Sequence, residues 1–362
     1  MYVRNLKLRN FRNYKEMETD FCPGLNIIYG QNGQGKTNII EALFLCAAGK
    51  SHRTAHDIDL INTEADSFCI DLFFENGQGD RTMQFRYNQK KQKAISIQEI
   101  PIRKIGELMG NFNAVIFSPE DLMMVKQGPA LRRRFIDIAL SQIKPSYFYA
   151  LQQYNKVLLQ RNTLLKQIKK NRDFMDTLEV WDQSLYQFGL EIIKQREVFL
   201  KEISILIEEN HKFISGNKEQ MLLKYQPSVT PENYFIKLKQ ATPGDIERES
   251  TSVGPHRDDY IYLLDGKELK IYGSQGQQRT AVLSSKLAEL MIMEKDTGEK
   301  PVLLLDDVLS ELDLDRQRLL FEKIKEIQTF VTCTDKNIVK TGENFKTTFY
   351  YIESGILEKN EK

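Results

Sequence analysis

The chain has 362 residues, of which 41% are hydrophobic and 28% are charged, and its net charge is +1. A chain of this length forms two domains, or one large domain with an inserted lobe, and the composition is that of a globular protein. The absence of an apolar run of about 18 residues excludes a membrane-spanning helix. Because the net charge is nearly neutral, any nucleic-acid surface must be a local patch.

The first ten residues alternate apolar and charged side chains and lack the long apolar core of a signal peptide, which predicts a cytoplasmic protein. The four cysteines show no CxxC pair and no metal-ligand spacing, and the four histidines show no such spacing either. We therefore expect reduced thiols and no zinc site.

The first 120 residues follow the pattern of an α/β domain. Strands are predicted at 1–8 and 24–29, and the second strand runs into a glycine-rich loop that precedes a helix at 38–48. Short alternating segments over 67–97, with glycines between two of them, predict antiparallel hairpins, and 114–117 predicts another short strand.

The glycine-rich loop fits the phosphate-binding pattern GxxxxGK[ST]. In such a loop, backbone N–H groups surround the phosphates at a helix N-terminus, and the helix dipole adds positive charge. Lys36 is placed to reach the β- and γ-phosphates of ATP, and the Thr37 hydroxyl to bind Mg²⁺. The predicted nucleotide-binding residues of the loop are Gly30, Gln31, Asn32, Gly33, Gln34, Gly35, Lys36, Thr37 and Asn38.

Several arginines allow two interpretations. Arg12 and the stretch 50–53 could touch nucleotide phosphates or ribose, and a simply exposed arginine is an equally good alternative. Arg132, Arg133 and Arg134 are consecutive and fan out on a helix, so they cannot all serve one partner. One of them holding an internal carboxylate is at least as good an interpretation as a phosphate contact.

The middle of the chain predicts an antiparallel helical hairpin. Apolar residues keep a 3/4 spacing over 151–168, with Arg161 in one of the apolar slots, and the spacing resumes over 181–206 after a polar turn. Strands return at 259–264, so the hairpin is inserted into the α/β pattern. In the turn at 254–259, His256 is more consistent with a structural hydrogen-bonding residue than with a proton acceptor.

The first hairpin helix is the leading candidate for DNA contact. No acidic residue lies between Asp137 and Asp173, whereas several basic residues do, and such a stripe would neutralise backbone phosphates without reading sequence. Acidic residues of the return helix could instead pair with these charges, and both alternatives stay open. The candidate DNA contacts are Lys156, Arg161, Lys166, Lys169 and Lys170.

An apolar strand at 302–305 ends in two carboxylates. Asp306 would hold Mg²⁺ through water, and Asp307 is the candidate for polarising the attacking water as a general base. Together with Lys36, these residues form the predicted catalytic set. A buried strand followed by an acidic helix cap is the alternative interpretation of Asp306 and Asp307.

A third element precedes a helix predicted to start near Thr280. It offers free N–H groups and a serine hydroxyl, which suit a second phosphate. Because Lys36 already holds the γ-phosphate within one subunit, this element makes most sense acting on the nucleotide of a partner subunit. Its residues are Ser274, Gln275, Gly276 and Gln277, and Ser310 and Asp313 would lie beside the same junction.

Together these motifs resemble one family, the RecF proteins of bacterial DNA repair, which are relatives of the SMC-type ABC ATPases. The resemblance covers nearly the whole chain and includes LRNFRNY, GQNGQGKTN, KSHRT, FSPEDL, RRRFID, GPHRDD, GSQGQQR and LLLDDVLSELD. By this resemblance, 274–278 corresponds to the ABC signature and 310–313 to the D-loop.

The resemblance implies an α/β fold, an ABC-type P-loop ATPase head with an inserted helical hairpin lobe. We assign 1–120 and 251–362 to the ATPase domain and 121–250 to the lobe. The family implies an ATP- and Mg²⁺-dependent homodimer that binds DNA at single-strand/double-strand junctions. It also implies RecA loading at gaps together with RecO and RecR, and a part in the SOS response.

One position departs from ABC transporters. Thr334 and Asp335 follow the strand 329–333, where transporters usually have a switch histidine. Hydrolysis is therefore expected to be slow and to serve as a conformational switch. The rival interpretations are another SMC-like ATPase of nucleic-acid maintenance, which the short hairpin disfavours, and a metabolic phosphotransferase, which would have no use for 273–279.

Overall fold

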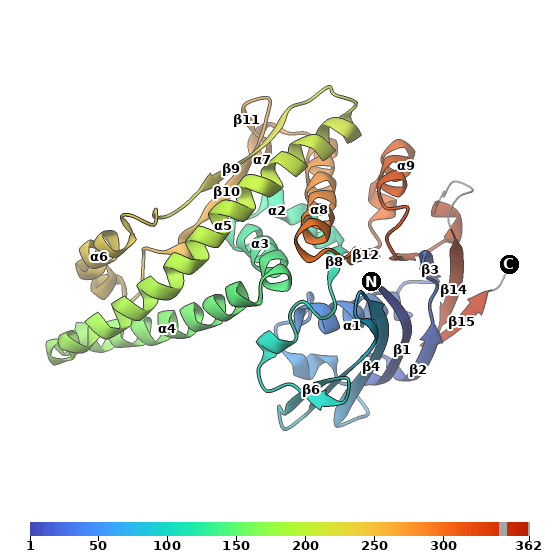
Figure 1. Cartoon of the computed structure of the whole chain (residues 1–362), viewed down its shortest axis with the longest axis horizontal. Helices are drawn as coiled ribbons and strands as arrows, with labels where there is room; N and C mark the ends of the chain where they lie inside the picture. Colours follow the sequence, from blue (N-terminus) through green and yellow to red (C-terminus); the bar gives the residue numbers. More distant parts are fainter. Residues whose placement is uncertain (340–345, 361–362) are drawn as a thin grey trace. The chain divides into compact units, whose positions relative to one another are not determined.

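The computed structural model describes residues 1–339 and 346–360 (Figure 1). The chain separates into two compact units, which are described one at a time. The first unit comprises Met1–Leu122 and Ser285–Lys362, and the second comprises Met123–Ser284. The second unit thus extends beyond the lobe expected at 121–250. The reason is that a strand after residue 250 pairs within that unit.

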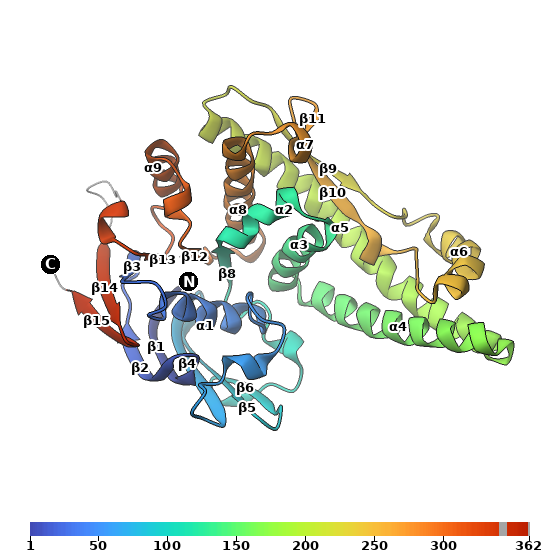
Figure 2. The ribbon, with the colours of Figure 1, turned by 180° about the vertical axis from the view of Figure 1, so that it is seen from behind.

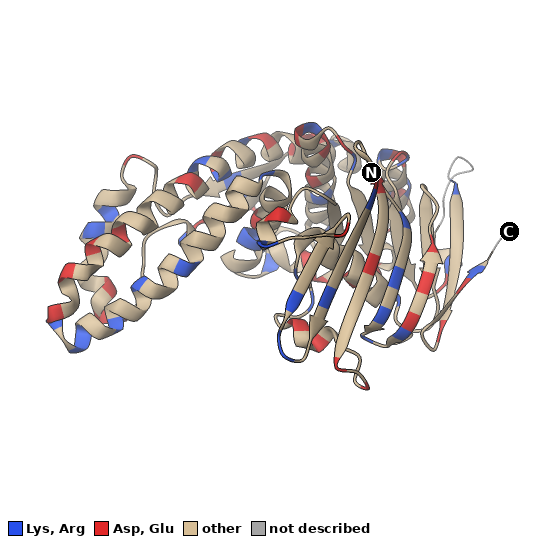
Figure 3. Ribbon diagram, turned by 60° about the horizontal axis from the view of Figure 1, so that its bottom comes forward, with Lys and Arg blue, Asp and Glu red and all other residues tan. Residues whose placement is uncertain are grey.

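The first unit contains a six-stranded antiparallel sheet in the order β2-β1-β4-β5-β6-β7. Its inward side chains alternate with charged outward ones, such as Lys7 bonded to Glu18 at 2.8 Å and Arg9 to Asp71 at 2.7 Å (Figure 3). The predicted hairpins over 67–97 are confirmed, whereas β2 was not predicted. The strands are β1 (Tyr2–Phe11), β2 (Tyr14–Asp20), β4 (Ser67–Asn76), β5 (Gly79–Asn88), β6 (Lys93–Ile97) and β7 (Ile100–Pro101).

A second six-stranded sheet has the order β15-β14-β3-β13-β12-β8, in which only β15 runs antiparallel to its neighbour. Three of its parallel strands, β8, β12 and β13, are buried along their whole length, as expected for strands covered on both faces. The strands are β3 (Leu25–Tyr29), β8 (Ala114–Phe117), β12 (Val302–Asp306), β13 (Thr329–Cys333), β14 (Thr347–Glu353) and β15 (Ile356–Asn360).

Helix α1 (Lys36–Ala48) lies between the two sheets, where it contacts β8, β12 and β13 on one side and β4 on the other. Because it is covered all round, its residues from Ile39 to Ala48 are apolar except for the buried Glu41. The remaining helices of this unit are α9 (Leu314–Lys323), most of α8, and the short 3-10 turns η1 (Asp57–Leu60), η2 (Ile105–Glu107), η3 (Pro119–Leu122), η6 (Leu309–Glu311) and η7 (Lys336–Ile338).

The second unit is built on the predicted hairpin of α4 (Pro145–Lys170) and α5 (Leu178–Ser215), which pack against each other (Figure 2). Strand β10 (Asp259–Leu264) pairs antiparallel with β9 (Met221–Gln226) and β11 (Lys267–Glu268), so residues after 250 belong to this unit. Its other elements are α2 (Met123–Lys126), α3 (Pro129–Ile143), η4 (Arg172–Thr177), α6 (Tyr234–Arg248), η5 (Pro255–Arg257), α7 (Leu269–Tyr272) and the start of α8 (Gln275–Thr297).

Buried arginines cross-link the second unit. Arg132 forms a two-pronged pair with Asp259 at 2.7 and 2.8 Å, which confirms that one of the three consecutive arginines holds an internal carboxylate. His256 lies between the Tyr154 hydroxyl at 2.6 Å and the Thr251 carbonyl at 3.0 Å, in the structural role expected for it. Burial lowers the pKa of His256 to about 4, so this histidine is neutral.

None of the helices in the described part of the chain combines the length and the apolar character needed to span a bilayer.

Candidate functional site

The carboxyl ends of the parallel strands bring the predicted site residues of the first unit to one edge. Cys333 at the end of β13 pairs with Tyr29 at the end of β3, Thr332 pairs with Asp306, and Leu305 with Phe117. The glycine-rich loop after β3 and the two carboxylates of β12 therefore meet, although more than 260 residues separate them in the sequence. The crevice outside such strand ends is where open α/β sheets bind ligands.

Two glycines of the loop have conformations that other residues do not tolerate. Gly35 has φ 115°, and a β-carbon there would lie 2.7 Å from the Asn13 amide and 2.9 Å from the Tyr14 hydroxyl. Gly30 has φ 151°, and a β-carbon there would lie 2.3 Å from the Ile352 carbonyl oxygen. The loop is thus moulded closely against β2 and β14 and their connections.

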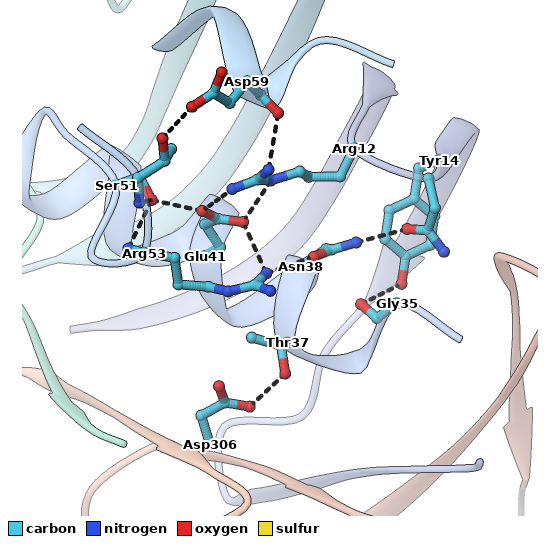
Figure 4. Close-up of polar contacts among 12 residues, drawn as sticks. Arg12, Tyr14, Gly35, Thr37, Asn38, Glu41, Ser51, Arg53, Asp59 and Asp306 are labelled. Atoms are coloured by element: carbon cyan, nitrogen blue, oxygen red, sulfur yellow. Dashed lines mark hydrogen bonds and ion pairs between the residues drawn. The ribbon is translucent and has the colours of Figure 1, made fainter. Parts of the chain in front are cut away.

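The β1–β2 turn braces this loop from outside. The Tyr14 hydroxyl donates to the Gly35 carbonyl at 3.0 Å (Figure 4). The Asn13 amide donates to the Gln34 carbonyl at 2.9 Å. No side chain caps the start of α1. The Asn38 N–H bonds to the Gly35 carbonyl at 2.9 Å, and the N–H groups of Lys36 and Thr37 before it are placed to meet a phosphate ligand, to which the helix dipole adds favourable charge.

Lys36 is folded over the loop. Its Nζ donates to the Gly30 carbonyl at 2.7 Å and the Gln31 carbonyl at 2.8 Å. Burial lowers the pKa of Lys36, and the negative charge of Asp307 opposes that shift. The ammonium group lies within the loop. When ATP is bound, its β- and γ-phosphates would replace the two carbonyls as the partners of this group.

Asp306 and Thr37 form an oxygen pair that fits Mg²⁺. The Thr37 hydroxyl donates to Asp306 Oδ1 at 2.8 Å (Figure 4). The Thr332 hydroxyl donates to the same oxygen at 2.7 Å. Hydroxyl and carboxylate oxygens are the donors Mg²⁺ prefers, and it typically takes one or two protein ligands, with water and phosphate completing its shell. Thr332, which fixes the carboxylate, was not predicted from the sequence.

Asp307 occupies a different environment from its neighbour. Its backbone has φ 54°, a left-handed conformation that is uncommon for a residue other than glycine, and its N–H donates to the Thr332 hydroxyl at 3.0 Å. Partial burial raises the pKa of Asp307, the adjacent Asp306 carboxylate raises it further, and Lys36 opposes the shift. A raised pKa brings this carboxylate nearer to what a general base requires.

A buried carboxylate organises the arginines beside the loop. Glu41 of α1 accepts from Arg12 Nε at 2.9 Å and NH2 at 2.7 Å, from Ser51 at 2.5 Å and from Arg53 at 3.3 Å (Figure 4). Burial by itself raises the pKa of Glu41, but the hydrogen bonds from Arg12 and Ser51 outweigh it, and the pKa is lowered. The carboxylate therefore stays charged.

Glu41 was missed by the sequence analysis. Its signal was a lone acidic residue inside an apolar helix. Arg12 was expected either to contact nucleotide or to be a simply exposed arginine. The structure places its guanidinium in this network, with 21% of the side chain exposed. Arg53 is 40% exposed and also donates to the Asn38 side chain at 2.9 Å, so the network reaches the loop itself.

The signature segment lies in the second unit and differs from expectation at its helix start. Helix α8 begins at Gln275 rather than near Thr280, so Gln275, Gly276 and Gln277 form its first turn. Ser274 Oγ accepts from the Gln277 N–H at 3.2 Å, and the Gln277 side chain accepts from the Ser274 N–H at 2.8 Å. This reciprocal capping box leaves Ser274 exposed at the helix start.

The D-loop residues follow the carboxylates directly. The Ser310 hydroxyl donates to the Asp307 carbonyl at 2.9 Å. The Asp313 carboxylate accepts from the Arg316 N–H at 2.9 Å and so caps α9. Thr334 and Asp335 stand where ABC transporters usually have a switch histidine, and both are exposed after β13. The Asp335 side chain accepts from the Asn337 N–H and so caps η7.

The predicted basic stripe on α4 is not uniform. Arg161 is fully buried and pairs with Asp182 at 2.7 Å and Asp245 at 2.9 Å, so its prediction as a DNA contact was wrong. Arg161 occupies an apolar position of α4 that faces α5, and a side chain at such a position cannot face DNA. Lys169 bonds to the Glu247 carbonyl at 2.6 Å and approaches Glu249. Lys156, Lys166 and Lys170 are exposed.

The sequence of this chain is similar to known proteins over nearly its whole length. The RecF/RecN/SMC N terminal domain family matches residues 2–355. A DNA replication and repair protein RecF from Acetivibrio thermocellus is 50% identical over 366 residues, which cover 98% of this chain and 99% of the relative. The RecF of Ruminiclostridium cellulolyticum is 48% identical over 360 residues, covering 95% of this chain and 97% of the relative.

Solved structures show the same fold. The recombination mediator protein RecF with ATP, of the RecFOR pathway, matches with a TM-score of 0.92 and 36% identity over 99% of this chain and 98% of that one. An Smc head domain from Pyrococcus furiosus matches with a TM-score of 0.57 and 18% identity, covering 99% of this chain and 96% of that one. The predicted ABC-type head with a helical lobe is confirmed by these likenesses.

Proposed function

Since the chain belongs to the RecF family, we propose that it is an ATP-driven dimerisation switch that holds DNA during repair and replication. The family resemblance predicted from the motifs is confirmed, and ATP is the ligand of the solved relative. The observation that carries the proposal is the hydrogen bond between Thr37 and Asp306, which joins the phosphate loop to the Mg²⁺-holding carboxylate.

The steps of the proposed cycle follow from the groups at the sheet edge. ATP binds to the loop with Lys36 and the start of α1, where the Thr37 hydroxyl and, through water, Asp306 would hold Mg²⁺. Ser274, Gln275, Gly276 and Gln277 of a second copy then cover the γ-phosphate. Asp307 accepts a proton from the attacking water, and loss of the γ-phosphate removes what the second copy was holding.

ATP thus shifts a population of monomers toward dimers, because only the dimer makes the extra contacts to the phosphate. Hydrolysis sets how long the closed state lasts, and we infer that it is slow because Thr334 stands where transporters have a histidine. Arg12 and Asn38 are proposed to border the nucleotide. Ser310 and Asp313 are proposed to border the partner.

The nucleic-acid partner is proposed to be DNA at single-strand/double-strand junctions, with RecO, RecR and RecA as pathway partners. We therefore propose that the protein acts on DNA in the cytoplasm. Within the helical hairpin, the contact would run through the exposed lysines of α4, while Lys169 is partly occupied by its own unit. A metabolic phosphotransferase would not need the exposed signature segment.

Dimerisation is tested by size-exclusion chromatography with and without ATP and Mg²⁺. The wild type should shift to a dimer only with ATP. Ser274→Arg places a bulky cation at the exposed start of α8, so it should still bind ATP but remain a monomer. A Ser274→Arg variant that dimerises like the wild type would sink the proposal.

DNA binding is tested by gel shift on duplex, single-stranded and gapped DNA at several salt concentrations. The triple change of Lys156, Lys166 and Lys170 to Glu should weaken binding at least ~10-fold and flatten the salt dependence. The matched control changes Lys194, Lys201 and Lys237, which are also exposed in the second unit, to Glu. Equal losses in both triples would show that only total charge matters.

A further inference from the structure

The segment between α5 and β9 carries a carboxylate that holds a residue of the signature segment. Glu219 Oε1 accepts from the side-chain amide of Gln277 at 2.9 Å. Its other oxygen, Oε2, lies 3.0 Å from Nε2 of His211, a fully buried histidine near the end of α5. All three residues belong to the second unit. The carboxylate therefore links the buried end of α5 to the first turn of α8.

The backbone on both sides of Glu219 keeps this carboxylate in place. Helix α5 ends at Gly216, whose left-handed conformation (φ 65°) is typical of the residue that closes a helix. After Glu219, the Gln220 N–H donates to the Asp265 side chain at 2.9 Å, and the Asp265 N–H donates to the Gln220 carbonyl at 2.9 Å. Glu219 is thus fixed from two directions, and its side chain is only 23% exposed.

A carboxylate partner decides which way round the Gln277 amide lies. An ionised carboxylate only accepts hydrogen bonds, so the NH2 group of Gln277 must face Glu219. The oxygen of the same amide then faces the Ser274 N–H, from which it accepts at 2.8 Å. Without this partner, either end of the amide can turn to the helix start, and the side chain regains its rotamer freedom. Glu219 therefore selects the arrangement that closes the capping box.

The closed box leaves the Ser274 hydroxyl able to donate. Ser274 Oγ accepts from the Gln277 N–H at 3.2 Å, and a hydroxyl oxygen that accepts still has its own hydrogen to give. Because Ser274 is exposed, this hydrogen is available to an acceptor from outside the chain, such as a phosphate oxygen. When the Ser274 N–H also turns to such a phosphate, Gln277 keeps its bond to Glu219. The first turn of α8 then stays ordered while its capping bond is exchanged.

We propose that Glu219 is a positioning residue for the signature segment, which holds Gln277 and is itself held by His211. This inference rests on the proposed covering of a phosphate by Ser274 and adds the residues that prepare the segment for it. Glu219 acts through Gln277 and does not itself contact the phosphate. A glutamine side chain that is already fixed has less rotamer entropy to lose when the dimer closes. Loss of Glu219 should therefore weaken dimerisation and leave ATP binding by the monomer unchanged.

The test measures the monomer–dimer constant by sedimentation with a slowly hydrolysed ATP analogue and Mg²⁺. Glu219→Met removes the acceptor but keeps the length of the side chain, and it should weaken dimerisation about 10-fold, because the change enters a two-fold dimer twice. Glu219→Gln keeps an acceptor oxygen for Gln277 and should retain most of the affinity. Glu208→Met is the matched control, since Glu208 lies on α5 at 27% exposure and pairs with Lys212.

A double-mutant cycle shows whether Glu219 acts through Gln277. In a Gln277→Met background, Glu219→Met should add less than about 2-fold to the loss that Gln277→Met causes alone. Full and additive losses would overturn the role through Gln277 and leave Glu219 a merely structural residue. ATP binding to the monomer and thermal unfolding, measured for every variant, identify those that have kept their fold. Glu219→Ala, which removes the same acceptor with less bulk, replaces Glu219→Met if that variant does not fold.

The outcomes separate this inference from the proposed function. If Glu219→Met dimerises like the wild type while Ser274→Arg stays monomeric, the positioning role is overturned and the switch stands. Stronger dimerisation of Glu219→Met would show that Glu219 competes with the phosphate for the Gln277 amide, and it overturns the positioning role as well. If the wild type fails to dimerise with ATP, the switch and the positioning role are overturned together. A folded Glu219→Met that binds ATP normally and dimerises weakly, beside a Glu219→Gln close to the wild type, supports the inference.

Discussion

The two elements that are proposed to bind phosphate are both helix starts, yet their hydrogen bonding differs. Helix α1 begins at the loop without a side-chain cap, and Lys36 lies folded within it. Helix α8 begins with its own capping box between Ser274 and Gln277. The first element is open to a ligand by itself. We propose that the second element exchanges its internal hydrogen bonds for contacts to a phosphate that the first element of another copy displays.

The largest effect is expected at the carboxylate that acts only in the chemical step. Asp307→Asn should lower ATP hydrolysis by about 100-fold or more, since the amide cannot take the proton from water. ATP binding and dimerisation should persist, because Lys36, Thr37 and Asp306 are untouched. Single-turnover hydrolysis checks this, with Asp315→Asn, an exposed carboxylate on α9, as control. Near-normal turnover would remove Asp307 from its assigned role.

A smaller loss is expected at the open element. Lys36→Arg should weaken ATP binding by about 10-fold or more, because a planar guanidinium does not fit the buried position in which the ammonium meets two carbonyls. Fluorescent-nucleotide titration measures this. Lys15→Arg, at an exposed lysine, should leave affinity unchanged. If both variants bind alike, the loop does not depend on its lysine.

The pH dependence of hydrolysis sharpens the same contrast within the site. A general base works as the carboxylate, which is lost as pH falls through its pKa. Because the pKa of Asp307 is raised, hydrolysis should decline at a higher pH than an ordinary aspartate, with pKa about 3.9, would give. ATP binding should not follow this decline. A hydrolysis profile that matches the binding profile at every pH would contradict the assignment.

The smallest effect is expected at the capped element. Ser274→Ala removes the hydroxyl that caps α8 and should cost about 1 kcal/mol of stability without nucleotide, while ATP binding by the monomer stays normal. Thermal unfolding is the measurement. Gln275→Ala, next to the cap but outside the box, is the control and should change stability less.

The sequence predicted local chemistry well, because loop spacing and strand periodicity are local properties. The strand and helix that flank the glycine-rich loop, the strand that ends at Asp306 and the helical hairpin all lie where the sequence predicted them, to within a few residues. Helix α8 begins at Gln275 and not near Thr280 as predicted, although the Ser274–Gln277 box is a recognisable helix start. Arg161 was wrongly predicted to contact DNA because its positive charge was considered before its position on the buried side of the helix.

What the sequence could not supply were contacts between distant segments. Arg12, Glu41 and Ser51 come from three separate segments of the chain and meet at the Glu41 carboxylate. Thr332 reaches Asp306 from the neighbouring strand. Pairings of this kind depend on strand order, which a single sequence does not state. The same is true of β9 and β10, whose pairing moved the boundary of the second unit.

Glu41 has a consequence for the timing of nucleotide capture. A free arginine side chain loses about 2 kcal/mol of rotamer entropy when it is fixed in one geometry. Arg12 and Arg53 are already held by the Glu41 carboxylate, so that loss occurs when the chain folds and not when ATP arrives. If these arginines border the nucleotide as proposed, they would meet it already aligned, and binding would require little rearrangement from them.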